Sequence, residues 1–298
     1  MAARQARSTT PTRTRPGEGL THRMSDDHQL AAELARGAGE LLLALREQIG
    51  DAAYDPRALK DHGDAVAQEH LAARLSLLRP DDAVLSEEAK DSDARLAAHR
   101  VWIVDPLDGT KEYSERADGV WRDDWAVHVA LWAADQDAPG DPAGRLVAGA
   151  VALPARGVVR STPDVELVAP ATGVWTPGTR PLRLAVSRSH PAEIVTRIAQ
   201  HLDVELVPMG SAGVKAMAVV DGTVDAYVHG GGQYQWDSAA PVAVARAAGL
   251  ATTRLDGTDL LYNEADPWLP DLIVCRPQTL PTIRTAIDAA TALEGPDK

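Results

Sequence analysis

The chain has 298 residues, of which 45% are hydrophobic and 24% are charged, as is ordinary for a globular protein. Its formal net charge of −13 argues against nucleic acid or an anionic membrane as a main partner. The single cysteine, Cys275, excludes an intramolecular disulfide and a cysteine-rich zinc site, and fits a cytoplasmic location. No apolar run approaches the ~20 residues that a membrane-spanning helix needs.

The first 23 residues differ in composition from the rest of the chain. They hold five arginines and one acid and contain no apolar stretch, so they lack the core of a secretory signal. We predict a disordered basic tail over 1–23. A transit peptide and a nucleic-acid arm are the alternatives, and Met24 offers a second start site.

The first half of the chain predicts two helices and then several strands. Apolar residues at helical spacing predict an amphipathic helix over 28–49, which Gly50 ends. A second helix is predicted over 65–80, where Pro80 stops it. Short apolar runs then predict strands at 82–89, 101–104, 125–133 and 146–154.

The second half alternates strands and helices irregularly. Strands are predicted at 182–190, 204–209, 224–229 and 270–276, and helices at 191–202, 212–222 and 237–249. Strands often follow one another directly, which favours α+β layers over a doubly wound parallel sheet. We expect an N-terminal subdomain over 24–165 and a C-terminal subdomain over 166–298.

Acidic residues stand where three apolar stretches end. Asp105 and Asp108 follow the apolar run 101–104, Glu87 follows an earlier strand, and Asp237 opens a helix. A carboxylate at the edge of the interior costs free energy unless it has a partner. Each acid alone has an ordinary explanation, as a turn residue, part of a capping box that starts at Ser86, or a helix cap.

Taken together, the acids predict a metal site. Carboxylates from three separate elements suit Mg²⁺, a hard cation with oxygen ligands, and no His/Cys pattern competes for another metal. Gly109 and Thr110 follow Asp108 directly, and backbone amides there can hold a phosphate oxygen. Acids that bind metal beside an anion site indicate phosphoryl chemistry.

Three motifs in order carry a family resemblance. "LSEEA", "WIVDPLDGT" and, roughly 130 residues later, "WDSAAPVAVARAAG" resemble the signatures of the inositol monophosphatase superfamily of Mg²⁺-dependent, lithium-sensitive phosphatases. The resemblance covers about residues 28–275. It implies an α+β fold, the layered αβαβα sandwich of the inositol monophosphatase and fructose-1,6-bisphosphatase type.

Within the superfamily, "GTKEYSER", "VSRSH" and "GSAGVKAMAVVDGTVDAY" resemble the CysQ-type 3′(2′),5′-bisphosphate nucleotidases, most closely those of actinobacteria. This implies a cytoplasmic enzyme that hydrolyses 3′-phosphoadenosine 5′-phosphate to AMP in sulfate assimilation, and a homodimer. The alternatives are a broader sugar phosphatase acting on fructose 1,6-bisphosphate or inositol monophosphate, and a pseudo-enzyme that binds metal and phosphate without turnover.

The resemblance also assigns metal ligands. Glu87, Asp105 and the backbone carbonyl of Leu107 would bind the first Mg²⁺ ion. Asp105, Asp108 and Asp237 would bind the second, so that Asp105 bridges the two ions and takes part in catalysis.

The same resemblance assigns the phosphate and the nucleophile. Gly109 and Thr110, beside Asp108, would hold the phosphate through backbone amides. The Thr110 hydroxyl, together with Glu87, would orient the attacking water, and a water near Asp237 would protonate the leaving oxygen.

One position departs from the family pattern. Where the family reads "TxAD", this chain reads "GDAVAQEHL", so that Ala65 stands for the threonine and Gln68 for the aspartate. Gln68 cannot carry the charge, which motivates the pseudo-enzyme alternative. Asp61 and Asp64 are substitutes in principle, but we interpret them as turn residues around Gly63. We predict a working two-metal enzyme with a weakened third site.

The remaining candidate residues would contact the substrate. Arg188 suits a second phosphate, or is an ordinary surface arginine, and Lys215 resembles a CysQ feature, or faces solvent. His229 stands where inositol-specific members have a glutamate, which argues against inositol phosphate. The segment "GGGQYQ" at 230–235 is longer than the family's usual linker. The full predicted set is Ser187, Arg188, Ser189, His190, Gly210, Ser211, Ala212, Lys215 and His229.

Overall fold

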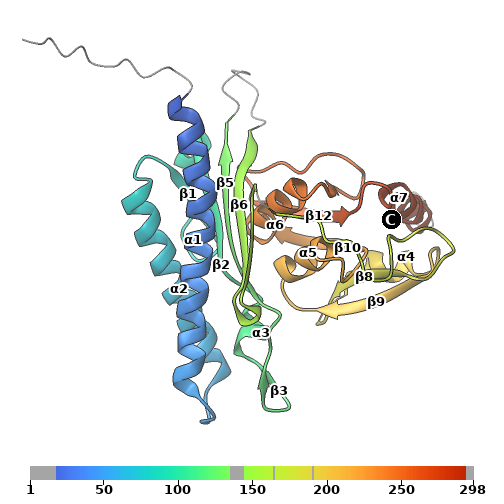
Figure 1. The fold of residues 1–298 in the computed structure, drawn as a ribbon, viewed down its shortest axis with the longest axis horizontal. Coiled ribbons are helices and arrows are strands. Elements are labelled where there is room, and N and C mark those ends of the chain that lie inside the picture. Colours follow the sequence, from blue (N-terminus) through green and yellow to red (C-terminus); the bar gives the residue numbers. More distant parts are fainter. Residues whose placement is uncertain (1–17, 135–143, 164, 190, 293–298) are drawn as a thin grey trace, which may run out of the picture.

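The computed structural model describes residues 18–134, 144–163, 165–189 and 191–292, with side chains from Asp27 onward. Two sheets and three layers of helices stack in the order helix, sheet, helix, sheet, helix (Figure 1). This arrangement confirms the predicted α+β fold and its αβαβα layering. No helix among the described residues is both long and apolar enough to cross a membrane.

The first sheet has five strands in the order β1-β2-β5-β6-β7. β1 runs parallel to β2, and the other neighbours are antiparallel. Its central strands are apolar on both faces because helices cover both sides. The bounds are β1 Ala83–Ser86, β2 Arg100–Asp108, β5 Ala126–Ala133, β6 Arg145–Leu153 and β7 Val158–Ser161.

Two antiparallel helices form the outer layer on this sheet. α1 (Glu18–Ile49) packs on β5 and β6, and α2 (Pro56–Leu78) packs on α1 and β2. α1 begins ten residues before the predicted start, so Glu18 and the next five residues of the predicted tail are helical, and 1–17 lie outside the described residues. α2 also begins earlier than predicted, because Asp55 caps it and Pro56 occupies its first position.

The middle layer consists of α5 (Ala212–Val220) and α6 (Gln235–Ala247). α6 packs on β2, β5 and β6 of the first sheet and also contacts the second sheet. The small residues of α6 permit a close approach: a Cβ added at Gly149 of β6 would lie 2.6 Å from the Cβ of Ala243. The middle helices therefore sit tightly between the two sheets, which explains the small-residue composition of α6.

The second sheet has the strand order β11-β12-β10-β8-β9. α4 (Glu193–Ile198) and α7 (Leu280–Ala292) contact each other and form the last helical layer, with α4 against β10. The bounds are β8 Leu182–Ser187, β9 Val204–Met209, β10 Ala226–Tyr234, β11 Ala251–Thr253 and β12 Trp268–Cys275. The predicted boundary at 165/166 falls between the strands of the two sheets, and two subdomains remain a prediction.

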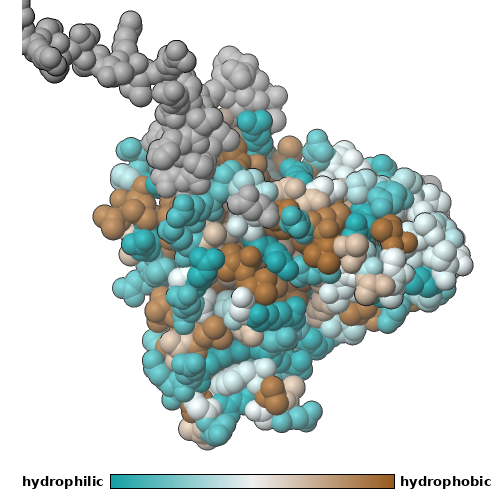
Figure 2. Space-filling view, in the orientation of Figure 1, coloured by the Kyte–Doolittle hydropathy of each residue, from teal (hydrophilic) through white to brown (hydrophobic). Residues whose placement is uncertain are grey.

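Several short elements complete the chain. α3 (Thr110–Ser114) follows β2, and a small hairpin of β3 (Arg116–Ala117) and β4 (Val120–Trp121) follows α3. Two 3₁₀ turns, η1 (Asp93–Ala97) and η2 (Pro154–Arg156), connect strands. On the face in Figure 2, hydrophilic side chains are interspersed with separate apolar patches, as on an ordinary protein surface.

Candidate active site

A β-bulge brings Asp105 and Asp108 to one side of the first sheet. In a regular strand, residues three apart point to opposite faces. Here Asp105 pairs with His128 and Asp108 pairs with Ala126, so three steps along β2 match two steps along β5. The extra residue re-aims the strand. The backbone N–H of Leu107 donates to Oδ1 of Asp105 at 3.0 Å, which fixes the bend.

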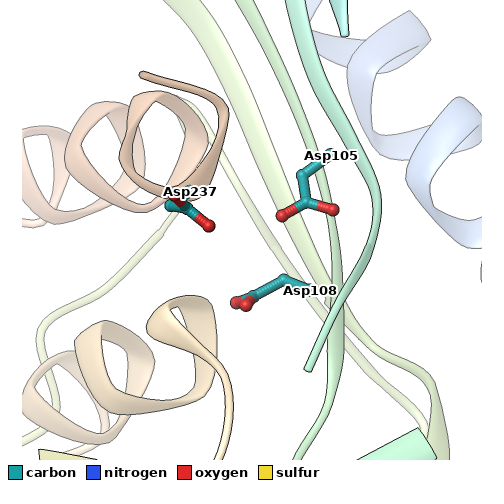
Figure 3. Close-up of side chains that lie close together, drawn as sticks. All are labelled: Asp105, Asp108 and Asp237. Atoms are coloured by element: carbon teal, nitrogen blue, oxygen red, sulfur yellow. The ribbon is translucent and has the colours of Figure 1, made fainter. Parts of the chain in front are cut away.

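Asp237 reaches the same point from the middle layer (Figure 3). It lies in the first turn of α6, and its Oδ2 accepts a hydrogen bond of 2.6 Å from the backbone N–H of Tyr234. The predicted alternative of a helix cap is correct only in part, because Tyr234 is the N-cap residue and Asp237, the third residue of α6, accepts the backbone N–H of Tyr234 in a capping box. A ligand atom from each of Asp105, Asp108 and Asp237 lies within 4.8 Å of the others.

The three carboxylates fit a cation. Oδ2 of Asp105 is buried and has no hydrogen-bond partner, although a buried polar atom is normally satisfied. Three hard oxygen donors at one point match the ligands that Mg²⁺ prefers. The orphaned oxygen and the donor set therefore agree with the predicted metal site, and Leu107, at the bend between the two acids, is buried as well.

The mutual repulsion of these acids perturbs their pKa values. Burial, followed by the charges of Glu87 and Asp108, raises the pKa of Asp105 well above its ordinary value. Burial and the charge of Asp108 raise the pKa of Asp237 to about 6. A bound cation would relieve this repulsion, since an opposite charge favours the ionised form.

Asp108 behaves differently because several donors hold it. Its Oδ2 accepts hydrogen bonds from the Ser211 hydroxyl and from the backbone N–H of Gly213 at 2.8 Å. Nε2 of His128 lies 3.2 Å from the same oxygen. Burial alone would raise the pKa of Asp108, but His128, Lys215 and the Ser211 hydrogen bond outweigh it and lower the pKa to about 2. Asp108 is thus ionised before any metal binds.

His128 is a site residue that the sequence reasoning missed. It is fully buried on β5, and its Nδ1 is 3.9 Å from Oδ2 of Asp105 and 3.2 Å from the carbonyl of Trp236. The only signal was a lone histidine in the apolar run 125–133. Its role became visible only when the register placed His128 opposite Asp105.

Glu87 lies just beyond the end of β1, near the three aspartates but outside the tight cluster. By its solvent-accessible surface the residue as a whole is exposed. Burial, followed by the charges of Asp237 and Glu88, raises the pKa of Glu87 to about 7. The predicted capping box at Ser86 is wrong, because Ser86 is the last residue of β1 and Ser92 caps the 3₁₀ turn.

The structure corrects the interpretation of the α2 acids. Asp61, Gly63 and Asp64 are not turn residues, because all three lie inside α2. Asp64 is buried, and burial, followed by the charge of Glu88, raises its pKa to about 7. Gln68, one helical turn later, accepts a 2.7 Å hydrogen bond from the Ser86 hydroxyl. α2 therefore does carry a buried acid, Asp64, which lies four residues before Gln68, the position of the aspartate in the family pattern.

Gly109 and Thr110 form the start of α3, and their contact with phosphate remains a prediction. Gly109 caps the helix with φ of +87°, a left-handed conformation that favours glycine. A Cβ there would come within 3.4 Å of the backbone of Trp125 and the carbonyl of Asp124. Glycine at position 109 therefore allows the chain to turn from β2 into α3. It also allows the backbone of Asp124 and Trp125, which follow β4, to pass close by.

Arg46 of α1 holds the segment that follows Gly109 in place. Its buried guanidinium donates to three backbone carbonyls, those of Glu112, Tyr113 and Arg122, at the end of α3 and beyond. The guanidinium also lies within 5.0 Å of the ring centroids of Tyr113, Trp121 and Trp125. No spacing rule in the sequence indicated this contact.

Arg188, a predicted substrate residue, is paired with acids rather than free. It lies just after β8, and its guanidinium contacts a carboxylate oxygen of Asp124 and Oε1 of Glu112, the latter at 3.4 Å. Asp124 also accepts a 2.7 Å hydrogen bond from the backbone N–H of Gly210. Arg188 is thus a partly exposed arginine held by two acids, its contact with substrate remains a prediction, and the sequence reasoning did not foresee its pairing with Asp124 and Glu112.

Lys215 is buried, so the alternative that it faces solvent is wrong. Its Nζ donates to the carbonyls of Ser211 at 2.6 Å and Gly210 at 3.2 Å. Burial lowers the pKa of Lys215, although Asp108 and Glu112 oppose the shift. Gly210, Ser211 and Ala212 thus form a turn that is held from both sides and lies against Asp108.

The other predicted substrate residues surround this turn. Ser187 ends β8, and Ser189 accepts a 3.0 Å hydrogen bond from Lys111. Nε2 of His229 lies 2.9 Å from the carbonyl of Gly232, and burial lowers the pKa of this histidine. His190 lies outside the described residues.

Comparison with known proteins agrees with this geometry. The model of the family described as "Inositol monophosphatase family" matches residues 24–289, which is most of the chain. The chain belongs to the inositol monophosphatase family. The predicted superfamily resemblance is therefore confirmed.

Curated relatives within this family are bisphosphate nucleotidases. The chain is 53% identical over 260 residues to a 3′-phosphoadenosine 5′-phosphate phosphatase of Mycobacterium leprae, covering 86% of this chain and 92% of the relative. The Mycobacterium tuberculosis protein of the same name is 52% identical, with 84% and 89% covered. The 3′(2′),5′-bisphosphate nucleotidase CysQ of Escherichia coli is 30% identical, with 80% and 94% covered.

Solved structures of family members share the fold. Staphylococcal IMPase-II with bound 2′AMP superposes with a TM-score of 0.68 at 19% identity, covering 89% of this chain and 97% of that one. Mycobacterium tuberculosis SuhB gives a TM-score of 0.63 at 22% identity, with 91% and 98% covered. The layered sandwich is thus common to family members of low sequence identity.

Proposed function

We propose that the chain is a metal-dependent phosphomonoesterase that hydrolyses 3′-phosphoadenosine 5′-phosphate to AMP and phosphate. The observation that carries the chemistry is the acid cluster, in which Asp105, Asp108 and Asp237 present oxygens within 4.8 Å and Oδ2 of Asp105 has no protein partner. The substrate is proposed from the two mycobacterial relatives, which are more than half identical and carry that activity in their names.

The metal is proposed to be Mg²⁺, with two ions in each site. Asp105, Asp108 and Asp237 would hold one ion, and Glu87, Asp105 and the Leu107 carbonyl would hold the other. When bound, Mg²⁺ neutralises the charge of the phosphate and acidifies the attacking water. Asp64 supports a third, weaker ion better than Gln68 does, because it is the buried acid of α2.

The protein groups then orient the phosphate ester. Ser211 and Gly213 occupy Oδ2 of Asp108, which leaves its Oδ1 for the metal. Gly109 presents the amides at the start of α3 to the phosphate, and the Thr110 hydroxyl orients the attacking water. No covalent enzyme intermediate is required.

The second phosphate of the substrate needs a cation of its own. Arg188 is paired with Asp124 and Glu112. Lys111, the residue after Thr110, is exposed, and its ammonium group donates to the Ser189 hydroxyl. Both cations lie at the segment that follows β8, since Arg188 belongs to this segment and Lys111 donates to Ser189, its next residue. We propose that Arg188 contributes charge through this network while the acids keep its guanidinium in position.

A direct assay tests the function. Phosphate release is measured with Mg²⁺ from 3′-phosphoadenosine 5′-phosphate, fructose 1,6-bisphosphate and inositol 1-phosphate, each with and without lithium. The first substrate should be preferred and lithium should inhibit. Asp105→Asn should remove the activity while the circular dichroism spectrum is kept, with Asp123→Asn, an exposed acid elsewhere, as control. Preference for either other substrate would refute the proposed specificity.

Assembly and location are proposed from the family resemblance. We propose a homodimer, which light scattering of the purified protein would test. The cytoplasmic location remains a prediction.

A further inference from the structure

Two exposed aromatic side chains contact each other near the start of the helix that carries Asp237. The chain has seven Trp, five Tyr and no Phe, and all twelve lie in the described part of the chain. Ten of them are buried or half-buried, whereas Tyr234 is 42% and Trp268 45% exposed. The two rings contact each other, with centroids 5.3 Å apart and planes at 80°. The exposed aromatic surface is thus concentrated at one place.

Both rings are fixed by the protein on one side. Tyr234 stacks on Trp236 at 4.6 Å with an interplanar angle of 11°. The backbone of Gly232 lies on Trp268, since a Cβ at Gly232 would come within 1.7 Å of the indole ring. Gly232 has φ of +90°, so glycine is required there for two independent reasons. Each ring is therefore covered on one side by the protein, and the rest of its surface is open to solvent.

This surface is attached to the candidate active site at both ends. The segment 230–236 connects His229 with Asp237, and a bulge in β10 falls between Gly230 and Gln233. The carbonyl of Gly232 contacts His229, and the backbone N–H of Tyr234 donates to Asp237. The long "GGGQYQ" segment therefore places Tyr234 three residues from a predicted metal ligand.

A hollow adjoins the indole ring. It has a volume of about 380 Å³ and is lined by Trp268, Gln235, Thr258 and Glu264, among others. Its walls also carry the charged side chains of Arg254, Asp259 and Glu264, whereas the Gln235 amide is buried and already hydrogen-bonded to the backbone of Asn263 and Asp266. A flat heterocycle with amino and ring-nitrogen groups can stack on the indole ring and form hydrogen bonds with such polar side chains.

We propose that Tyr234 and Trp268 form a platform for the adenine base of the substrate, with the base stacked on one ring and in contact with the edge of the other. This inference rests on the proposed function and deepens it, because it assigns the base-binding part of the same site. The acid cluster and its metals hold the phosphate, and the uncharged segment 230–236 holds the uncharged base. Stacking on an aromatic side chain contributes binding energy without requiring a specific hydrogen-bond pattern.

Binding rather than turnover tests the platform. Calorimetry with Mg²⁺ present measures the dissociation constants of AMP and of ribose 5-phosphate, which lacks the base. Tyr234→Ala and Trp268→Ala should each weaken AMP binding about tenfold, and should change ribose 5-phosphate binding less than about twofold. Tyr234→Phe keeps the ring and should keep AMP affinity. Leu77→Ala, at an exposed position of α2, is the matched apolar control.

The outcomes separate the platform from the proposed function. If both alanine variants bind AMP like the wild type, the platform is refuted, and a shift in their sedimentation would then assign the surface to self-association. Equal losses for AMP and ribose 5-phosphate would also refute it, since the base would not be the group recognised. Failure of the wild type to hydrolyse 3′-phosphoadenosine 5′-phosphate would refute the function, while a base-dependent loss of AMP binding would still support the platform.

Discussion

Replacing Asp237 by Asn should remove activity and yet stabilise the metal-free protein. Burial, followed by the charge of Asp108, raises the pKa of Asp237 from 3.8 to about 6. A shift of that size corresponds to roughly 3 kcal/mol of unfavourable interaction for the ionised form. Because the side chain is half-buried and solvent screens part of the repulsion, we expect a gain of about 1–3 kcal/mol in the free energy of unfolding.

The sign of the effect depends on pH. The folded pKa of Asp237 lies above the unfolded value, so the folded protein holds the proton more tightly, and stability is lost as pH rises from about 4 through 6. The Asn variant avoids this loss, so its advantage should be absent near pH 4 and complete above pH ~7. Asn also keeps an oxygen that can accept the capping hydrogen bond from Tyr234.

Urea unfolding in EDTA at about pH 4.5 and about pH 7.5 measures the difference. Mg²⁺ should reverse the order, because it binds the folded wild type and stabilises it by mass action. Asp123→Asn removes an exposed acid outside the cluster and should show no comparable dependence on pH or metal. An Asp237→Asn variant that is less stable than the wild type in EDTA at both pH values would refute the reasoning.

Three further predictions follow from the site. Arg46→Met should lower the free energy of unfolding by about 3–5 kcal/mol in urea titrations, because three carbonyls lose a buried charged donor; an unchanged midpoint would contradict this. Asp64→Asn should reduce kcat more than Gln68→Ala does, and the opposite order in a steady-state assay would return the role to Gln68. At low Mg²⁺, activity should rise between about pH 6 and about pH 7, where Asp237 and Glu87 lose their protons; a profile that more Mg²⁺ does not shift to lower pH would count against it.

The positions of the three clustered aspartates could be predicted from the sequence because their signals are local. Asp105 and Asp108 follow an apolar run directly, and Asp237 opens a helix of small residues, so chain order alone indicated where each acid emerges. The layered fold was also predictable, since strands in consecutive pairs and helices of clear period favour α+β layers. Both inferences needed only neighbours in sequence, together with the family resemblance.

The parts that could not be predicted depend on contacts between distant segments. The register between β2 and β5 decides that His128 stands opposite Asp105, and no local pattern encodes it. Asp64 looked like a turn residue because Gly63 precedes it, but packing of α2 keeps the helix intact there. α7 was overlooked although its sequence carries a helix signal, because its buried residues Ile283, Ala286, Ile287 and Ala290 stand at the i, i+3, i+4, i+7 spacing of an amphipathic helix.

The close fit between Gly149 and Ala243 has a consequence for the metal. α6 carries Asp237, whereas β2 carries Asp105 and Asp108, so the gap between helix and sheet fixes how far apart the ligands stand. Gly149 lets α6 approach the sheet closely, since a Cβ added at this position would lie 2.6 Å from the Cβ of Ala243. We therefore expect substitutions of Gly149 in the hydrophobic interior to change the metal affinity of the acid cluster, although Gly149 is not one of the three acids.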